Sequence, residues 1–223
     1  MKKTMIILFL LSLQGPLPAQ QTKEISHYLF PEFVQGVVLM KSGQKNPAML
    51  NFNAATEEMV FNQNGQVLAL AEPTLSQLDT VFLKDKKFVL HNKKFVEVLH
   101  QDGYRLFGQY KCRVIPPGKP AAYGGTSQTS SADSYSSWSS GGRVYELQLP
   151  DDFQVKPYMV YLLDNGSGWK EIKSMKQLRN LYKKNKAAYD QYLNENEVDF
   201  ADPLSVAALI RFLETIPSSV KSR

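Results

Sequence analysis

Histidine, cysteine and serine are the residues with which this chain could hold a metal ion or attack a substrate. The three histidines, His27, His91 and His100, are not at the spacing of metal ligands, and no pair of cysteines accompanies them. The sequence has no Gly-x-Ser-x-Gly elbow, and residues 124–127 lack the lysine and the spacing of a phosphate-binding loop. We therefore predict no metal site, no cofactor and no catalytic residue that the sequence identifies.

Paired carboxylates occur at Glu57-Glu58 and at Asp151-Asp152. A glycosidase needs two carboxylates that face one cleft, whereas adjacent residues of a strand point to opposite faces. Neither pair supplies that geometry. Catalytic groups can still meet from distant parts of a chain, so a hydrolase site assembled at the rim of a sheet remains an alternative.

The single cysteine, Cys112, lies between Lys111 and Arg113 and alternates with Tyr110 and Val114. The two cations would favour a reactive thiolate. In a strand, however, they point away from the face that carries the thiol. We therefore predict a buried, unreactive cysteine.

A basic run begins at Lys170, with seven cations up to residue 186 and only Glu171 opposing them. On a helix these cations lie opposite the apolar stripe of Met175, Leu178 and Leu181. The run is either a solvated helix face or a docking surface for a polyanion or a partner protein. The candidate residues of this basic face are Lys173, Lys176, Arg179, Lys183 and Lys184.

A second candidate site lies in a Ser/Gly-rich loop at about residues 116–142. Tyr123, Tyr135 and Trp138 stand there among small polar residues. Aromatic rings among serines and glycines are typical of adaptable binding loops, and the same composition also suits a plain connector.

Short apolar segments rich in β-branched and aromatic residues recur about every ten residues from 34 to 115, and again at 144–149, 158–163 and 169–172. Turn pairs such as Asn64-Gly65 and Asp102-Gly103 separate them, which indicates hairpins. Both faces of the segment 95–99 carry apolar residues, so that strand should be central or sandwiched. We expect an antiparallel β-meander, closed as a barrel or folded as a sandwich.

The apolar period becomes helical after residue 173. Ser174 and Gln177 form a possible capping box, and Asp202-Pro203 is a favoured helix start. A helical stripe is also present around residues 187–193, and Pro217 ends the last one. The expected fold class is α+β, with a β-rich domain at 20–172 and a three-helix segment at 173–216.

The composition is that of an ordinary globular protein: 223 residues, 43% hydrophobic, 21% charged. Lys2 and Lys3 precede an apolar segment at residues 5–13, helix-breaking residues and Ala19. This order predicts a signal peptide at 1–19, too short to span a bilayer, and no transmembrane span after cleavage. Its removal lowers the formal charge of +5 to +3, because two lysines leave; this favours no nucleic-acid partner.

Several segments resemble exported proteins of unknown function from Bacteroidota. They are residues 28–33, 36–38, 50–53, 57–59, 122–127, 184–186 and 198–200. The resemblance implies an envelope location and no assigned activity. It also implies that Asp79-Thr80-Val81 is similar to the O-glycosylation motif of these bacteria, with Thr80 as the acceptor.

These observations predict an exported protein of the periplasm, cell surface or extracellular space. Its role would be non-catalytic, either binding or structural. Its partner would be an envelope glycan, a lipid or a protein. The alternatives are the hydrolase at the sheet rim and a helical docking module with a basic face. Nothing in the sequence indicates the oligomeric state.

Overall fold

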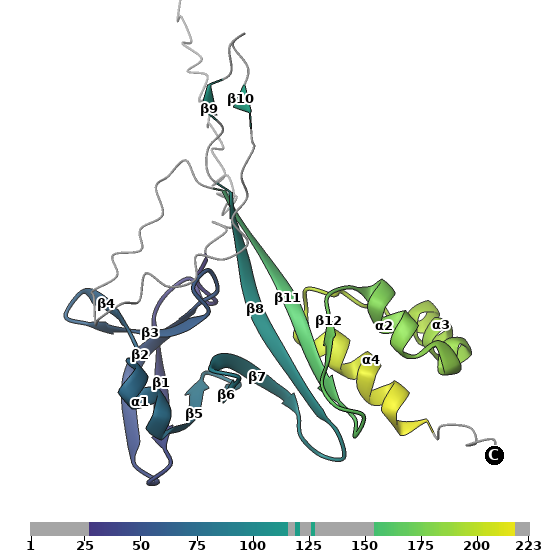
Figure 1. Cartoon of the computed structure of the whole chain (residues 1–223), viewed down its shortest axis with the longest axis horizontal. Coiled ribbons are helices and arrows are strands. Elements are labelled where there is room, and N and C mark those ends of the chain that lie inside the picture. The colour runs from purple at the N-terminus through teal and green to yellow at the C-terminus, as the bar shows by residue number, and fades with distance from the viewer. Residues whose placement is uncertain (1–26, 116–118, 121–125, 128–153, 217–223) are drawn as a thin grey trace, which may run out of the picture.

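The computed structural model describes residues 27–115, 119–120, 126–127 and 154–216 (Figure 1). It confirms the α+β class, with an antiparallel ten-stranded sheet and helices at the C-terminal end. The strand order is β12-β11-β8-β7-β6-β5-β1-β2-β3-β4. The strands are β1 (Val34–Met40), β2 (Lys45–Asn53), β3 (Glu58–Gln63), β4 (Gln66–Ala69), β5 (Leu78–Leu83), β6 (Lys86–His91), β7 (Lys94–His100), β8 (Arg105–Ile115), β11 (Gln154–Asp164) and β12 (Lys170–Ile172).

The sheet consists of two meanders that meet at β1. Strands β1 to β4 follow one another, and the chain then returns so that β5 pairs with the other edge of β1. A short helix, α1 (Glu72–Gln77), makes this return. No sequence pattern predicts this helix, because six residues with little apolar content give no helical period. Asn64 and Gly65 both have positive φ, 53° and 85°, as the predicted type I′ turn requires.

The sheet curls strongly but does not close into a barrel. Phe52 on β2 and Phe88 on β6 stack with their ring centroids 5.7 Å apart, although β1 and β5 lie between these strands. Three strand spacings in a flat sheet would separate them by roughly 14 Å. Tyr110 on β8, 6.2 Å from Phe52, lies inside the same curl. The chain thus forms one open, curled sheet, which is neither of the two expected arrangements, a closed barrel or a sandwich of two sheets.

The C-terminal segment contains α2 (Met175–Leu181), a 3₁₀ turn η1 (Lys183–Asn185), α3 (Lys186–Glu195) and α4 (Pro203–Thr215). Figure 1 shows them beside β11 and β12, away from β1–β4. Ser174 accepts a hydrogen bond from the Gln177 amide (3.3 Å), and the Gln177 side chain accepts one from the Lys173 amide (2.7 Å). The predicted cap is therefore present. Asp202 also caps α4, through the Leu204 amide (3.0 Å).

Two hydrophobic cores lie along the same sheet. The first fills the curl and includes Phe52, Phe88 and Cys112. The second lies between the sheet and the helices and includes Leu106, Tyr161 and the buried face of α4. Tyr110 packs against both. The side chains of β8 therefore belong to the first core near its end and to the second near its start.

Several predicted segments lie outside the described residues: the signal peptide at 1–19, the strand at 144–149 and most of the Ser/Gly-rich loop. Within that loop, β9 (Lys119–Pro120) and β10 (Thr126–Ser127) pair as a separate two-stranded sheet, which the sequence analysis did not predict. No helix among the described residues is long and apolar enough to cross a membrane.

Candidate functional site

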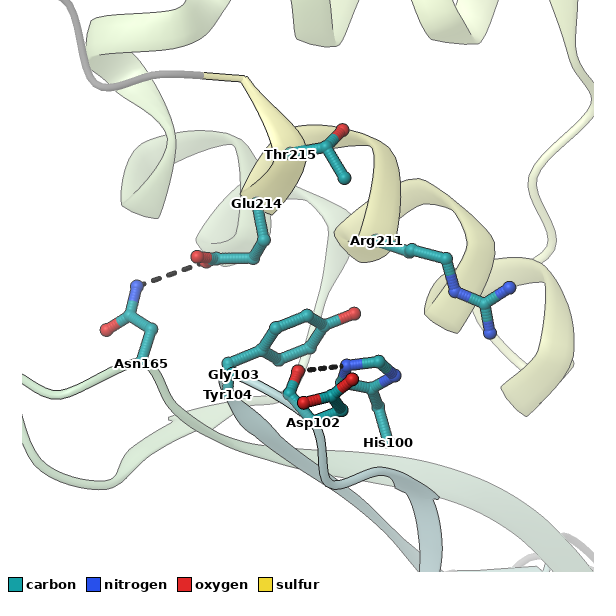
Figure 2. Close-up of a pocket in the computed structure, with 8 residues that line it drawn as sticks. All are labelled: His100, Asp102, Gly103, Tyr104, Asn165, Arg211, Glu214 and Thr215. Atoms are coloured by element: carbon teal, nitrogen blue, oxygen red, sulfur yellow. Dashed lines mark hydrogen bonds between the residues drawn. The ribbon is translucent and has the colours of Figure 1, made fainter.

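A pocket of about 460 Å³ lies where the turn between β7 and β8 faces the last turns of α4 (Figure 2). We call it the rim pocket, because the turn forms the rim of the sheet. Its lining residues are His100, Asp102, Gly103, Tyr104, Asn165, Arg211, Glu214 and Thr215.

The turn positions an imidazole against a phenol. Gly103 has φ +77°, a conformation that glycine adopts without strain, and it brings Tyr104 back beside His100. The two rings stack with centroids 4.0 Å apart. His100 Nε2 lies 2.5 Å from the Asp102 carbonyl oxygen. Because a carbonyl only accepts, Nε2 carries the hydrogen, and Nδ1 is the acceptor whenever the ring is neutral.

Helix α4 brings the opposite wall. Arg211, Glu214 and Thr215 are three and four residues apart and therefore share one helix face, while Ile210 and Leu213 are buried. This pattern follows directly from an amphipathic helix. The same helix that closes the second core thus presents a polar row to the turn.

Hydrogen bonds hold Glu214 in place. Its Oε1 accepts from Asn165 Nδ2 at 3.1 Å and from the Tyr182 hydroxyl at 2.5 Å. Burial, with the bond to Glu214, raises the pKa of Tyr182, which therefore remains a donor. Within the described part of the chain, Oε2 has no hydrogen-bond donor, so it can accept from a ligand.

The Tyr104 hydroxyl is the unusual atom of the pocket. It is buried, and no group in the described ranges meets the geometry of a hydrogen bond to it, although the Arg211 side chain is close enough to interact with it electrostatically. Burial raises the pKa of Tyr104, against the opposing charge of Arg211, so the hydroxyl remains protonated at neutral pH. A buried polar group without a partner costs about 1–3 kcal/mol, and a ligand or a water molecule would relieve that cost.

The rim pocket therefore offers both donors and acceptors. Tyr104 and Arg211 donate, whereas the carboxylates of Glu214 and Asp102 accept. Asp102 and Glu214 are also two carboxylates that line one pocket at the sheet rim. No pattern in the sequence connects His100 with α4.

The candidate basic face is exposed but partly neutralised. Arg179 donates to both carboxylate oxygens of Asp190 on α3, at 2.9 and 3.0 Å, and Lys173 pairs with Glu171 at 2.9 Å. Lys176, Lys183 and Lys184 have no carboxylate within ion-pair distance among the described residues. Asp190 follows the basic run in the sequence, so a count over the run alone overestimates its charge.

The other predicted site residues do not meet the rim pocket. Thr80 lies on β5 and is only 4% exposed, with its hydroxyl donating to Asp79 at 2.9 Å. The folded chain therefore does not offer the Thr80 hydroxyl to a modifying enzyme. Tyr123, Tyr135 and Trp138 lie outside the described residues.

Cys112 is buried, as predicted, and burial raises the pKa of its thiol from 9.0 to about 11. We expect alkylation of the native protein by iodoacetamide at mildly alkaline pH to be at least about 100-fold slower than in guanidinium chloride. Mass spectrometry of the labelled chain measures this. Equal rates would contradict the burial. Since the folded pKa is the higher one, this group also makes folding less favourable as pH rises from about 9 to about 11.

No cluster of three or more metal-ligating side chains occurs in residues 27–115 or 154–216. Comparison with known proteins finds no matching family model, no matching curated protein and no matching solved structure. The resemblance to exported Bacteroidota proteins therefore stays a prediction, and the functional argument depends on the site itself.

Proposed function

We propose that this protein is an exported, non-catalytic binding protein of the cell envelope, whose rim pocket holds a hydroxyl-rich ligand such as the end of an envelope glycan. The observation that carries the proposal is Tyr104, which lines a pocket of ligand size and whose buried hydroxyl has no partner of hydrogen-bond geometry in the described chain. The leader-like residues 1–19 support export.

The size and chemistry of the pocket support a small polar ligand. Its volume of about 460 Å³ falls in the range of small-molecule sites, roughly 300–1,000 Å³. Each hydroxyl of a sugar is both a donor and an acceptor, so it can bond to Tyr104 or Arg211 and to a carboxylate at once. Asn165 and Tyr182 fix Glu214 before a ligand arrives, which reduces the ordering cost of binding.

Replacing Tyr104 by phenylalanine should weaken saccharide binding by about 5- to 30-fold, because it removes the hydroxyl and keeps the ring that stacks on His100. Titration of a panel of neutral and acidic saccharides, followed by calorimetry, measures this. Tyr192→Phe is the matched control, since Tyr192 packs on Phe212 of α4 and does not line the pocket. Unchanged affinity in Tyr104→Phe, or no binding of any saccharide, would refute the proposal.

The hydrolase is the second candidate, favoured by the two carboxylates of the pocket, Asp102 and Glu214. Glycoside hydrolysis uses one carboxyl as acid and another as base or nucleophile. One carboxylate oxygen of Glu214 already accepts hydrogen bonds from Tyr182 and Asn165. This arrangement favours a role for Glu214 as a fixed hydrogen-bond acceptor over a role as a proton donor. The test is whether the wild-type protein releases reducing sugar from envelope glycans. If it does, and if both Asp102→Asn and Glu214→Gln abolish the release, the function is hydrolysis and not binding.

A further inference from the structure

The face of α2 and η1 presents cations that the rim pocket does not use. Lys173, Lys176, Arg179 and Lys183 follow one another at intervals of three and four residues, from just before the N-cap of α2 into η1, and we call them the basic stripe. Lys184 and Lys186 continue it, and all six side chains are exposed. The opposite side of α2 is anchored in the second core through Leu178. The stripe is thus held rigidly toward solvent.

This surface carries an excess of positive charge. Between residues 170 and 190 there are seven cations and two carboxylates, Glu171 and Asp190. Both carboxylates already have partners, Lys173 and Arg179. Lys176, Lys183 and Lys184 therefore lack a balancing charge among the described residues. The acidic residues Glu195 and Glu197 lie at and beyond the other end of α3.

A hollow with apolar and charged walls lies next to Lys176. A pocket of about 620 Å³ between α2 and α3 is lined by Met175, Lys176, Arg179, Tyr189, Asp190, Leu193 and Asn194. Met175 and Leu193 are partly exposed in this hollow, whereas Tyr189 is buried. Partly exposed apolar side chains beside cations are a combination found where proteins meet the headgroup region of a bilayer. A purely polysaccharide partner would not use the apolar part.

We propose that the exported protein binds peripherally, through this α2–η1 surface, to a membrane that contains anionic lipids. Lysine ammoniums suit this role because they are point charges on flexible stems and can meet many phosphate positions, whereas the guanidinium of Arg179 is fixed on Asp190. The interaction adds attachment to the envelope and is independent of the ligand in the rim pocket.

The test is co-sedimentation with vesicles of phosphatidylcholine alone or mixed with phosphatidylglycerol, using the chain from Gln20 so that the apolar leader does not contribute. We expect binding only to the mixed vesicles and a steep loss as salt rises from about 0.05 to about 0.5 M. Each lysine near an anionic surface contributes about a fivefold increase in partitioning. Lys176→Glu, Lys183→Glu and Lys184→Glu together should lower it by at least about 100-fold.

The matched control reverses the same number of charges elsewhere: Lys45→Glu, Lys87→Glu and Lys156→Glu, on β2, β6 and β11. This triple variant should lose much less binding. Equal losses in the two triple variants would show that only net charge matters and would overturn the proposal. So would equal binding to both vesicle types, no binding to either, or binding of the wild-type chain to dextran sulfate without binding to vesicles.

Discussion

Glu97→Ala is expected to destabilise the fold by about 3–5 kcal/mol, the cost of leaving a buried charge without its partner. Glu97 lies on the central strand β7 and is only 4% exposed. Its Oε1 is 3.0 Å from the Lys86 ammonium, and its Oε2 accepts a hydrogen bond from the Tyr110 hydroxyl at 2.5 Å. Truncation would strand a mostly buried ammonium and a mostly buried hydroxyl in the interior. Urea unfolding, followed by circular dichroism, measures the change in free energy of unfolding.

The control for this variant is the exposed ion pair of Lys93 with Glu72, which is 3.8 Å long and has both side chains more than 70% exposed. Glu72→Ala should change the free energy of unfolding by less than about 0.5 kcal/mol. The triple variant Glu97→Leu, Lys86→Met and Tyr110→Phe should recover part of the loss, because no polar group then lacks a partner. A loss below about 1 kcal/mol in Glu97→Ala would show that water reaches this site.

Gly36→Ala is expected to cost about 2–3 kcal/mol, or to prevent folding, because the added methyl has no room. A Cβ at Gly36 would lie 2.7 Å from the Phe82 carbonyl oxygen and 2.8 Å from Leu50 Cδ1. The carbonyl belongs to β5, which pairs with β1 at this position, so it cannot move without disturbing the ladder between the two meanders. Thermal and urea unfolding of the purified variant measure the loss.

Gly108→Ala is the matched substitution for comparison. A Cβ at Gly108 would meet Met159 Cε at 3.2 Å and Leu99 Cδ1 at 3.3 Å, both at the ends of flexible side chains. We expect a loss below about 1 kcal/mol there, since these ends can shift. If the two glycine variants unfold at the same urea concentration, crowding against the backbone does not explain why position 36 is a glycine.

Local features of this fold were predictable from the sequence, whereas the pairing and packing of distant strands were not. Asn64-Gly65 and Asp102-Gly103 indicated hairpins because their conformations are set within a few residues. The central position of β7 followed from apolar residues on both of its faces, and β6 and β8 indeed flank it. The return of β5 to β1, and the curl that brings Phe52 to Phe88, depend on contacts between distant residues and left no local pattern.

The rim pocket illustrates the same division. The sequence indicates each wall of the pocket separately. One wall is the turn after His100, and the other is the polar row of Arg211 and Glu214 on an amphipathic helix. Their meeting depends on how α4 docks against the sheet, more than one hundred positions along the chain from Tyr104. The basic face was predictable because its residues lie close together in the sequence, but its partner Asp190 was missed because it lies on the next helix.

Strand β8 has a consequence for the cooperativity of the molecule. Leu106 near its start belongs to the core under the helices, and Cys112 and Val114 near its end belong to the core within the curl. Strand β11 runs beside it along all eleven residues and divides its side chains in the same way. The paired strands β8 and β11 therefore contribute side chains to both hydrophobic cores. Unfolding of either core would disrupt the pairing of these strands, on which the other core also depends.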